Sequence, residues 1–260
     1  VLDGYIMEEK LSDGANKALS SAARNYANRI DQFNRQNTLF LKTESNLQAI
    51  NHFITRKAAP PFNRQALLEI LRALKSRQNE VITSYAILNA EGINILDTDP
   101  ESLGADESQQ KYFSKVIGDN QPGTYRSPII FDNEQAVIVF SSAIHDLSGK
   151  LIGVLRAKYD ASILTSLFNR TKGMVGQGSF VVLLDENNLR LEHGRRSDLK
   201  YTLASTMSKE ALSSLIAEKR IPVNSSTAFV EGPEWNEKIR SASIQSPIIE
   251  TQFYGLGVAN

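Results

Sequence analysis

The sequence of 260 residues contains no cysteine, only three histidines and a single tryptophan. Without cysteine the chain can form neither disulfide bonds nor zinc–thiolate centres, and it has no thiol nucleophile. The histidines, His52, His145 and His193, lie far apart, and no two of them have the spacing of a metal-binding pair. We therefore expect the chain to hold no metal ion and no cofactor.

An excess of charge and long apolar runs are also missing. Lys plus Arg and Asp plus Glu both number 29, so the formal net charge is zero. A nucleic-acid-binding domain needs a basic excess to neutralise phosphates, so we expect no nucleic-acid partner. No apolar run approaches the roughly 18–20 residues that cross a bilayer, and the first residues lack the features of a signal peptide. We expect neighbouring segments of a longer protein beyond both ends.

Proline is absent before Pro60, and the only glycines in that stretch are Gly4 and Gly14. Apolar residues recur there every three or four positions, which predicts one long helix over residues 1–55. The apolar stripe consists of Leu11, Ala15, Ala18, Ala22, Tyr26, Ile30, Phe33, Phe40, Leu47 and Ile50. So sustained a stripe favours a stalk that packs against the same helix of a second copy, so we expect a homodimer. The alternative is a core helix of a single domain.

The remainder of the chain contains the same order of expected elements twice. Pro60 and Pro61 end the helical pattern, and Asn63 can cap a second helix over 64–78. The first copy has expected strands over 81–88, 93–96, 123–130, 135–144 and 151–159, with helices over 109–117 and 161–168. The second has strands over 180–184, 189–192, 226–230, 237–246 and 252–259, with a helix over 208–219 that Ser208 caps. A Gly-rich stretch over 171–178 separates the copies. We therefore predict an α+β fold of a long N-terminal helix and two tandem modules, each an antiparallel sheet flanked by helices.

Four segments resemble the double Cache sensor domain, a PAS-like family. They are ILNAEG at residues 87–92, DESQQKYF at 106–113, GTYRSP at 123–128 and SAIHDLSGKLIGVL at 142–155. Each segment alone is a loose match, and their order along the chain carries the resemblance. Such domains are the outward-facing sensors of chemoreceptors, histidine kinases and cyclic-dinucleotide enzymes. The resemblance implies a dimeric extracytoplasmic sensor, anchored in the membrane through flanking helices.

The resemblance also implies a division of labour within the chain. Residues 1–55 would form the stalk, residues 56–170 the membrane-distal module that binds a small molecule, and residues 171–260 the membrane-proximal module. The chain contains no catalytic motif, so we expect it not to be an enzyme, with a sensor histidine kinase as the parent protein. The alternatives are a chemoreceptor ectodomain and an interaction module that senses a periplasmic binding protein.

A subset of the family binds amino acids through an Arg, a Trp, a Tyr and an Asp. By motif position these correspond to Gln110, Tyr112, Ile129 and Lys158, so none keeps its identity here. The resemblance therefore argues against amino-acid binding by that arrangement. It still identifies these four positions as candidate ligand-binding residues.

Strand alternation adds two further candidates. Tyr125, Ser127 and Ile129 share one face of their strand, whereas Arg126 has the opposite parity and is expected at the surface. A half-buried Lys158 needs an anionic partner to stay charged, which predicts a ligand with a carboxylate or phosphate. The alternative for Lys158 is solvent exposure or a pair with a nearby Asp. Tyr112 and Tyr125 can equally be core aromatics.

Overall fold

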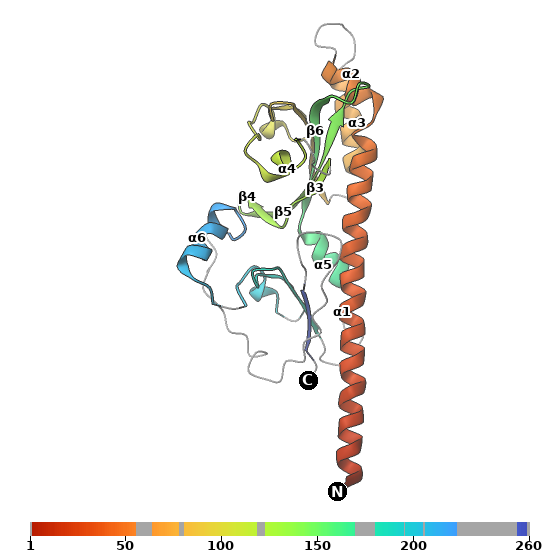
Figure 1. Cartoon of the computed structure of the whole chain (residues 1–260), viewed down its shortest axis with the longest axis vertical. Coiled ribbons are helices and arrows are strands. Elements are labelled where there is room, and N and C mark those ends of the chain that lie inside the picture. Colours follow the sequence, from red (N-terminus) through yellow and green to blue (C-terminus); the bar gives the residue numbers. More distant parts are fainter. Residues whose placement is uncertain are drawn as a thin grey trace. The chain divides into compact units, whose positions relative to one another are not determined.

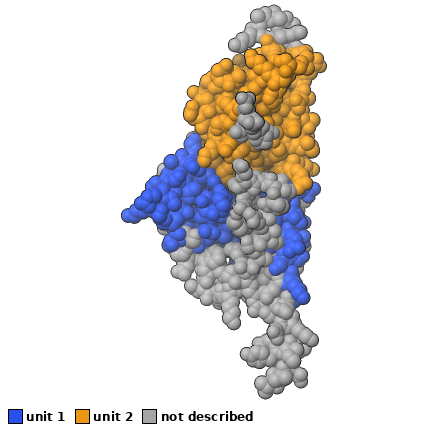
Figure 2. Space-filling model, viewed as in Figure 1, with its two compact units in different colours: residues 1–33, 164–260 blue, residues 34–163 orange. Residues whose placement is uncertain are grey.

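The computed structural model describes residues 2–55, 64–77, 81–118, 123–169, 180–194, 196–204, 206–222 and 254–258 (Figure 1). The chain divides into two compact units. Unit 1 comprises residues 1–33 and 164–260, and unit 2 comprises residues 34–163 (Figure 2). The first helix contributes to both units, because the division between them falls inside it.

Helix α1 (Leu2–Glu44) is shorter than predicted, and a separate helix α2 (Gln48–Thr55) follows it. The Oγ of Ser45 and the Nδ2 of Asn46 both donate to the carbonyl oxygen of Lys42, at 2.9 and 2.7 Å. Such side-chain bonds compete with the helical pattern, which explains why the helix ends here. The predicted apolar stripe also differs, because Phe40 is 37% exposed while the next residue, Leu41, is buried.

The buried side of α1 changes character along its length. In unit 1 it is mainly apolar and includes Ala23, Tyr26 and Ile30, with Asp31 as a buried charged residue. In unit 2 it is largely polar, with Asn34, Asn37, Leu41, Glu44 and Ser45 buried at or next to the end of the helix. Helix α3 (Arg64–Ser76) follows the prediction, with Leu67 and Leu71 fully buried. Pro60, Pro61 and Asn63 lie outside the described residues.

Unit 2 is built on one antiparallel sheet. Successive side chains along its strands point to opposite faces, and both faces are covered. The strand order is β2-β1-β6-β5-β3, and β4 also pairs with β5. The strands are β1 (Ile82–Asn89), β2 (Asn94–Asp97), β3 (Thr124–Arg126), β4 (Ile130–Asp132), β5 (Gln135–His145) and β6 (Leu151–Asp160). A 3-10 helix, η1 (Pro100–Ser102), precedes α4 (Lys111–Ser114). The helix predicted over 109–117 is thus only about one turn long.

The turn between β1 and β2 shows why the predicted hairpin forms. The Oδ1 of Asn89 accepts hydrogen bonds from the backbone N–H of Glu91 and of Ile93, at 3.1 and 2.8 Å. Gly92 has φ +87°, and a Cβ there would lie 2.6 Å from the Cα of Ser108. Glycine is required at this position by both the backbone conformation and the close approach.

Unit 1 contains a smaller antiparallel sheet. Its order is β8-β7-β9, from β7 (Phe180–Leu184), β8 (Arg190–His193) and β9 (Tyr254–Val258). The helical elements are α5 (Ser162–Asn169), whose first residues belong to unit 2, η2 (Ser197–Leu199) and α6 (Lys209–Ala217). Ser208 caps α6 as predicted, because its Oγ accepts from the N–H of Ala211. The strands predicted over 226–230 and 237–246, and the linker over 171–178, lie outside the described residues.

Candidate functional site

One face of the unit 2 sheet is covered by helix α4, and most of the predicted site residues lie around it. Every second residue of β6 faces this side of the sheet, namely Val154, Arg156 and Lys158. We call it the α4 face. Its apolar part is a cluster of Leu88, Tyr112, Phe113, Val116, Val137, Val139 and Val154, against which Ile117, Tyr125 and Ile130 pack. The cluster brings α4 and the central strands together.

Gln110 and Tyr112 reach this face through α4 itself. Gln110 is the half-buried N-cap residue, and its side chain makes no capping hydrogen bond. Tyr112 is buried, and its hydroxyl donates to the Oε2 of Glu107 at 2.8 Å. Burial, with the negative charge of Glu107, raises the pKa of the Tyr112 hydroxyl above its ordinary value. Tyr112 therefore remains a hydrogen-bond donor at any physiological pH.

Tyr125, Ser127 and Ile129 occupy different environments. Tyr125 is half-buried and packs against the same cluster as Tyr112. The Oγ of Ser127 donates to the carbonyl oxygen of Pro128 at 2.6 Å and accepts from the N–H of Val139 at 2.8 Å. Ser127 thus fastens this segment to β5. Ile129 is 2% exposed, and the next residue, Ile130, packs against the cluster.

The prediction that Arg126 lies at the surface is wrong, because this side chain is buried. Its parity is opposite to that of Tyr125, as expected. It stands opposite Phe140 in the β3–β5 pairing, however, and Phe140 is itself buried. The second face of the sheet is therefore covered as well. A residue that faces away from Tyr125 is consequently buried and not exposed to solvent.

Lys158 pairs with an aspartate, which is one of the two alternatives stated for it above. Its Nζ lies 2.6 Å from the Oδ2 of Asp132 on β4, and the two side chains are 15% and 33% exposed. The pair therefore spans from β6 to β4 at a partly open part of the α4 face. The charge of Asp132 also contributes, after burial and Glu107, to the raised pKa of Tyr112. Asp132 of the charged pair is consequently close enough to interact electrostatically with Tyr112.

A fully buried arginine forms the polar part of the α4 face. Arg156 has no exposed side-chain surface and donates four hydrogen bonds. Its Nη2 bonds the Oδ2 of Asp97 and the Oε1 of Glu107, both at 2.9 Å. Its Nε bonds the Oε2 of Glu107 at 3.0 Å, and its Nη1 bonds the Oγ of Ser84 at 2.7 Å. The guanidinium thus ties β6 to β1, β2 and the segment before α4.

The surroundings of Arg156 hold both carboxylates in place. The Nδ2 of Asn94 donates to Asp97 at 2.7 Å and to Glu107 at 3.0 Å. Burial alone would lower the pKa of Arg156, but the charges of Glu107 and Asp97 raise it above its ordinary value. The arginine is therefore permanently charged, and two carboxyl groups face it.

Our sequence reasoning missed this cluster. One indication was available: Arg156 stands between Leu155 and Ala157 in a strand whose central residues are buried on both faces. A charge in such a strand requires a partner of opposite charge. Nothing local identifies that partner, because Asp97 and Glu107 are 59 and 49 positions away.

The described residues provide neither a metal-binding group nor a membrane-spanning helix. In that part of the chain, no group of three or more His, Asp or Glu side chains could hold a metal ion. Nor does any described helix combine the length and the apolar character that crossing a membrane requires.

The fold and the site define a two-unit α+β protein with a long N-terminal helix and a partly open, charged sheet face. The sequence model of the Cache domain family (dCache_1) matches residues 5–246. The chain therefore belongs to the Cache family, and it is a non-catalytic sensor domain. No curated protein matches the chain.

Solved structures share the fold at low sequence identity. The sensory domain of the Campylobacter jejuni chemoreceptor Tlp3 (CcmL) with isoleucine bound has a TM-score of 0.63 and 15% identity, covering 96% of this chain and 95% of that one. The sensor domain of the Vibrio cholerae histidine kinase DctB has a TM-score of 0.57 and 13% identity, covering 92% and 97%. An extracellular ligand binding receptor from Desulfohalobium retbaense has a TM-score of 0.57 and 13% identity, covering 91% of this chain but only 39% of the receptor. These likenesses confirm the predicted fold.

Proposed function

We propose that this chain is the extracytoplasmic part of a transmembrane signal receptor and that it binds a small molecule on the α4 face. The observation that carries the proposal is the Lys158–Asp132 pair, a partly exposed charged pair on the sheet face whose apolar cluster the half-buried Tyr125 packs against. A partly open face that combines an apolar floor with a few polar groups has the composition of a ligand site. The site belongs to residues 56–170, the proposed membrane-distal module.

The proposed ligand carries a carboxylate or a phosphate. Lys158 is too buried to lose its partner without cost, so an incoming anion must replace Asp132 and not merely remove it. Asp132 is the more exposed of the two and can turn towards water when displaced. Tyr125 and Gln110 can then donate hydrogen bonds to the remaining polar atoms of the ligand. Ser127 and Ile129 would shape the adjoining wall.

Signal transmission would begin at the opposite face of the same strands. Tyr159 directly follows Lys158, and its hydroxyl donates to the Oδ1 of Asn37 on α1 at 3.0 Å. The hydroxyls of Ser142 on β5 and Ser45 lie 3.0 Å apart. A ligand that shifts β6 or β5 therefore also shifts the contacts of α1. We propose that this biases a pre-existing equilibrium between two positions of α1, in a homodimer formed through that helix.

The proposed parent is a sensor histidine kinase anchored in the membrane by segments on either side of this chain. The likeness to a histidine kinase sensor domain supports this output. A chemoreceptor is the second candidate, supported by the likeness to a chemoreceptor sensory domain. Direct binding of a free metabolite would separate both from a module that senses a periplasmic binding protein.

The test is a thermal-melt screen against small carboxylates, phosphates, amines, amino acids, purines and sugars. A ligand at about 100 times its dissociation constant adds roughly 2.7 kcal/mol to the free energy of unfolding. For a chain of this size we expect a shift of several degrees, at about 2–4 °C per kcal/mol. The shift should occur with an anionic class and disappear in Lys158→Ala.

The matched control is Lys150→Ala, an exposed lysine in the β5–β6 turn of the same unit. It should leave the ligand-induced shift unchanged. An equal loss in both variants would argue for a general charge effect, and binding of a purely cationic compound that depends on Lys158 would contradict the anion proposal. No shift with any class would favour a protein partner.

A further inference from the structure

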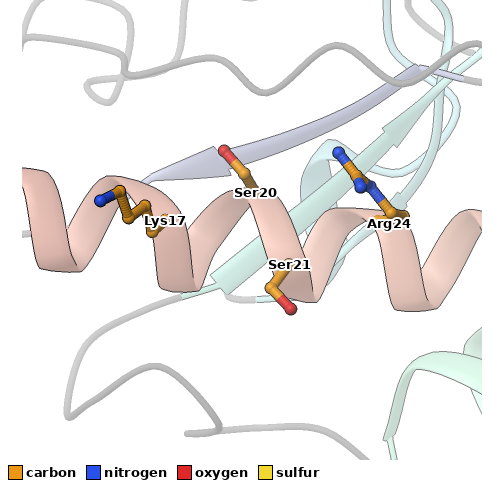
Figure 3. Close-up of a pocket in the computed structure, with 4 residues that line it drawn as sticks. All are labelled: Lys17, Ser20, Ser21 and Arg24. Atoms are coloured by element: carbon orange, nitrogen blue, oxygen red, sulfur yellow. The ribbon is translucent and has the colours of Figure 1, made fainter.

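Helix α1 lines a pocket in the part that belongs to unit 1. Its described lining consists of Lys17, Ser20, Ser21 and Arg24, and its volume is about 340 Å³ (Figure 3). The four residues follow one another by three, one and three positions, so they share one side of the helix, within an arc of roughly 100°. The described part of the lining is therefore one face of the helix.

The charged residues of the described lining all carry the same sign. Both ionisable residues of the described lining are basic, and no carboxylate lines it among the residues that the structure describes. Within that same part of the chain, neither Lys17 nor Arg24 forms an ion pair. This contrasts with Lys158, Arg156, Lys200 and Arg220, each of which has a carboxylate partner. Two cations on one helical face, with no carboxylate partner among the described residues, favour the binding of an anion.

The spacing limits the size of that anion. Seven positions separate Lys17 from Arg24, which corresponds to about 10.5 Å along the helix. Ser20 lies between the two cations along the helix; in Figure 3 Arg24 leans towards Ser20, whereas the Lys17 amine points away from it and must turn to reach the same group. A volume of about 340 Å³ lies at the small end of ligand pockets, which span roughly 300–1,000 Å³. A small molecule with two negative charges meets both constraints.

We propose that this pocket is an anion-binding site for a doubly charged oxyanion, either a phosphate or a pair of carboxylates. Arg24 can bind one oxyanion edge through two parallel N–H donors, Lys17 neutralises the second charge, and Ser20 donates one hydrogen bond. The site is independent of the α4 face, because all four lining residues lie in unit 1. The anion can be a free solute or the headgroup of a lipid, since both present the same chemistry.

Calorimetric titration with inorganic phosphate and with glutarate tests the proposal on the whole chain. We expect saturable binding that weakens roughly five- to tenfold in Lys17→Gln or Arg24→Gln and is lost in the double variant. Added salt should weaken it as well. Arg24→Lys should retain part of the affinity, because it keeps the charge and loses the paired donors.

Two variants separate this site from others. Lys42→Gln removes an exposed lysine from the same helix outside the pocket, and it should bind the probes as the unaltered chain does. Lys158→Ala serves as the background for the titrations, because it removes the anion binding proposed for the α4 face. Sedimentation with phosphatidylcholine vesicles, with and without phosphatidic acid, identifies the source. Binding to acidic vesicles alone, lost in the double variant, assigns the site to a lipid headgroup. No saturable binding to any probe, or an equal loss in Lys42→Gln, overturns the proposal.

Discussion

Replacing Arg156 with methionine is expected to lower the free energy of unfolding of the chain by about 3–5 kcal/mol. Methionine fills much of the same volume but leaves Asp97 and Glu107 without their cation in a site that water does not reach. An uncompensated buried carboxylate is among the costliest single defects in a protein. The melting temperature should fall by roughly 10 °C, measured by circular dichroism on heating.

The matched control is Arg196→Met, which breaks an ion pair with Asp198 whose side chains are 38% and 64% exposed. This change should alter stability by less than about 0.5 kcal/mol, because exposed pairs contribute little. A triple variant that joins Arg156→Met with Asp97→Asn and Glu107→Gln should recover part of the loss, since it removes the unpaired charges. If Arg156→Met melts like Arg196→Met, the buried cluster does not hold β6 to the segment before α4.

The local features of the fold could be predicted because local chemistry determines them. Turn residues such as Asn89 and Gly92 fix the first hairpin, and the Oγ of Ser208 caps α6 where the sequence pattern places it. The long helix was overextended for an equally local reason. The apolar pattern continued past Glu44, but the side-chain hydrogen bonds of Ser45 and Asn46 ended the helix there.

The polar half of the α1 surface could not be predicted from apolar periodicity. Asn37 is buried because it accepts from Tyr159, and Glu44 is buried because it accepts from Tyr85 and pairs with Arg77. These partners lie 33 to 122 positions away along the chain. The pattern therefore showed where the helix lies and not which of its sides the sheet covers.

The candidate site shows the same contrast between local features, which the sequence predicts, and long-range contacts, which it does not. Family motifs and strand parity led to Tyr112, Tyr125 and Lys158, and the structure places all three on or beside the α4 face. The motifs could not reveal that Lys158 meets Asp132 or that Arg156 gathers Asp97 and Glu107, because tertiary pairing alone brings these residues together. The ligand-binding roles of the six candidates remain predictions.

Gly153→Ala is expected to lower the free energy of unfolding by about 3 kcal/mol, the second-largest effect of a single change. A Cβ at Gly153 would lie 2.4 Å from the carbonyl oxygen of Leu88 and 3.3 Å from the Cδ1 of Ile54. The first contact is with backbone, so no side-chain rotation relieves it, and β1 and β6 must move apart. We expect the melting temperature to fall by roughly 6–12 °C.

Gly14→Ala is the matched control, with the opposite expected sign. Gly14 is an exposed residue of α1, and an added Cβ there meets nothing within 4 Å. Alanine should therefore stabilise the helix by up to about 1 kcal/mol. A normal melting temperature for Gly153→Ala would mean that β1 and β6 separate readily. In that case β6, which carries Lys158 on one face and Tyr159 on the other, could not transmit a ligand-induced shift to α1 as a rigid strand.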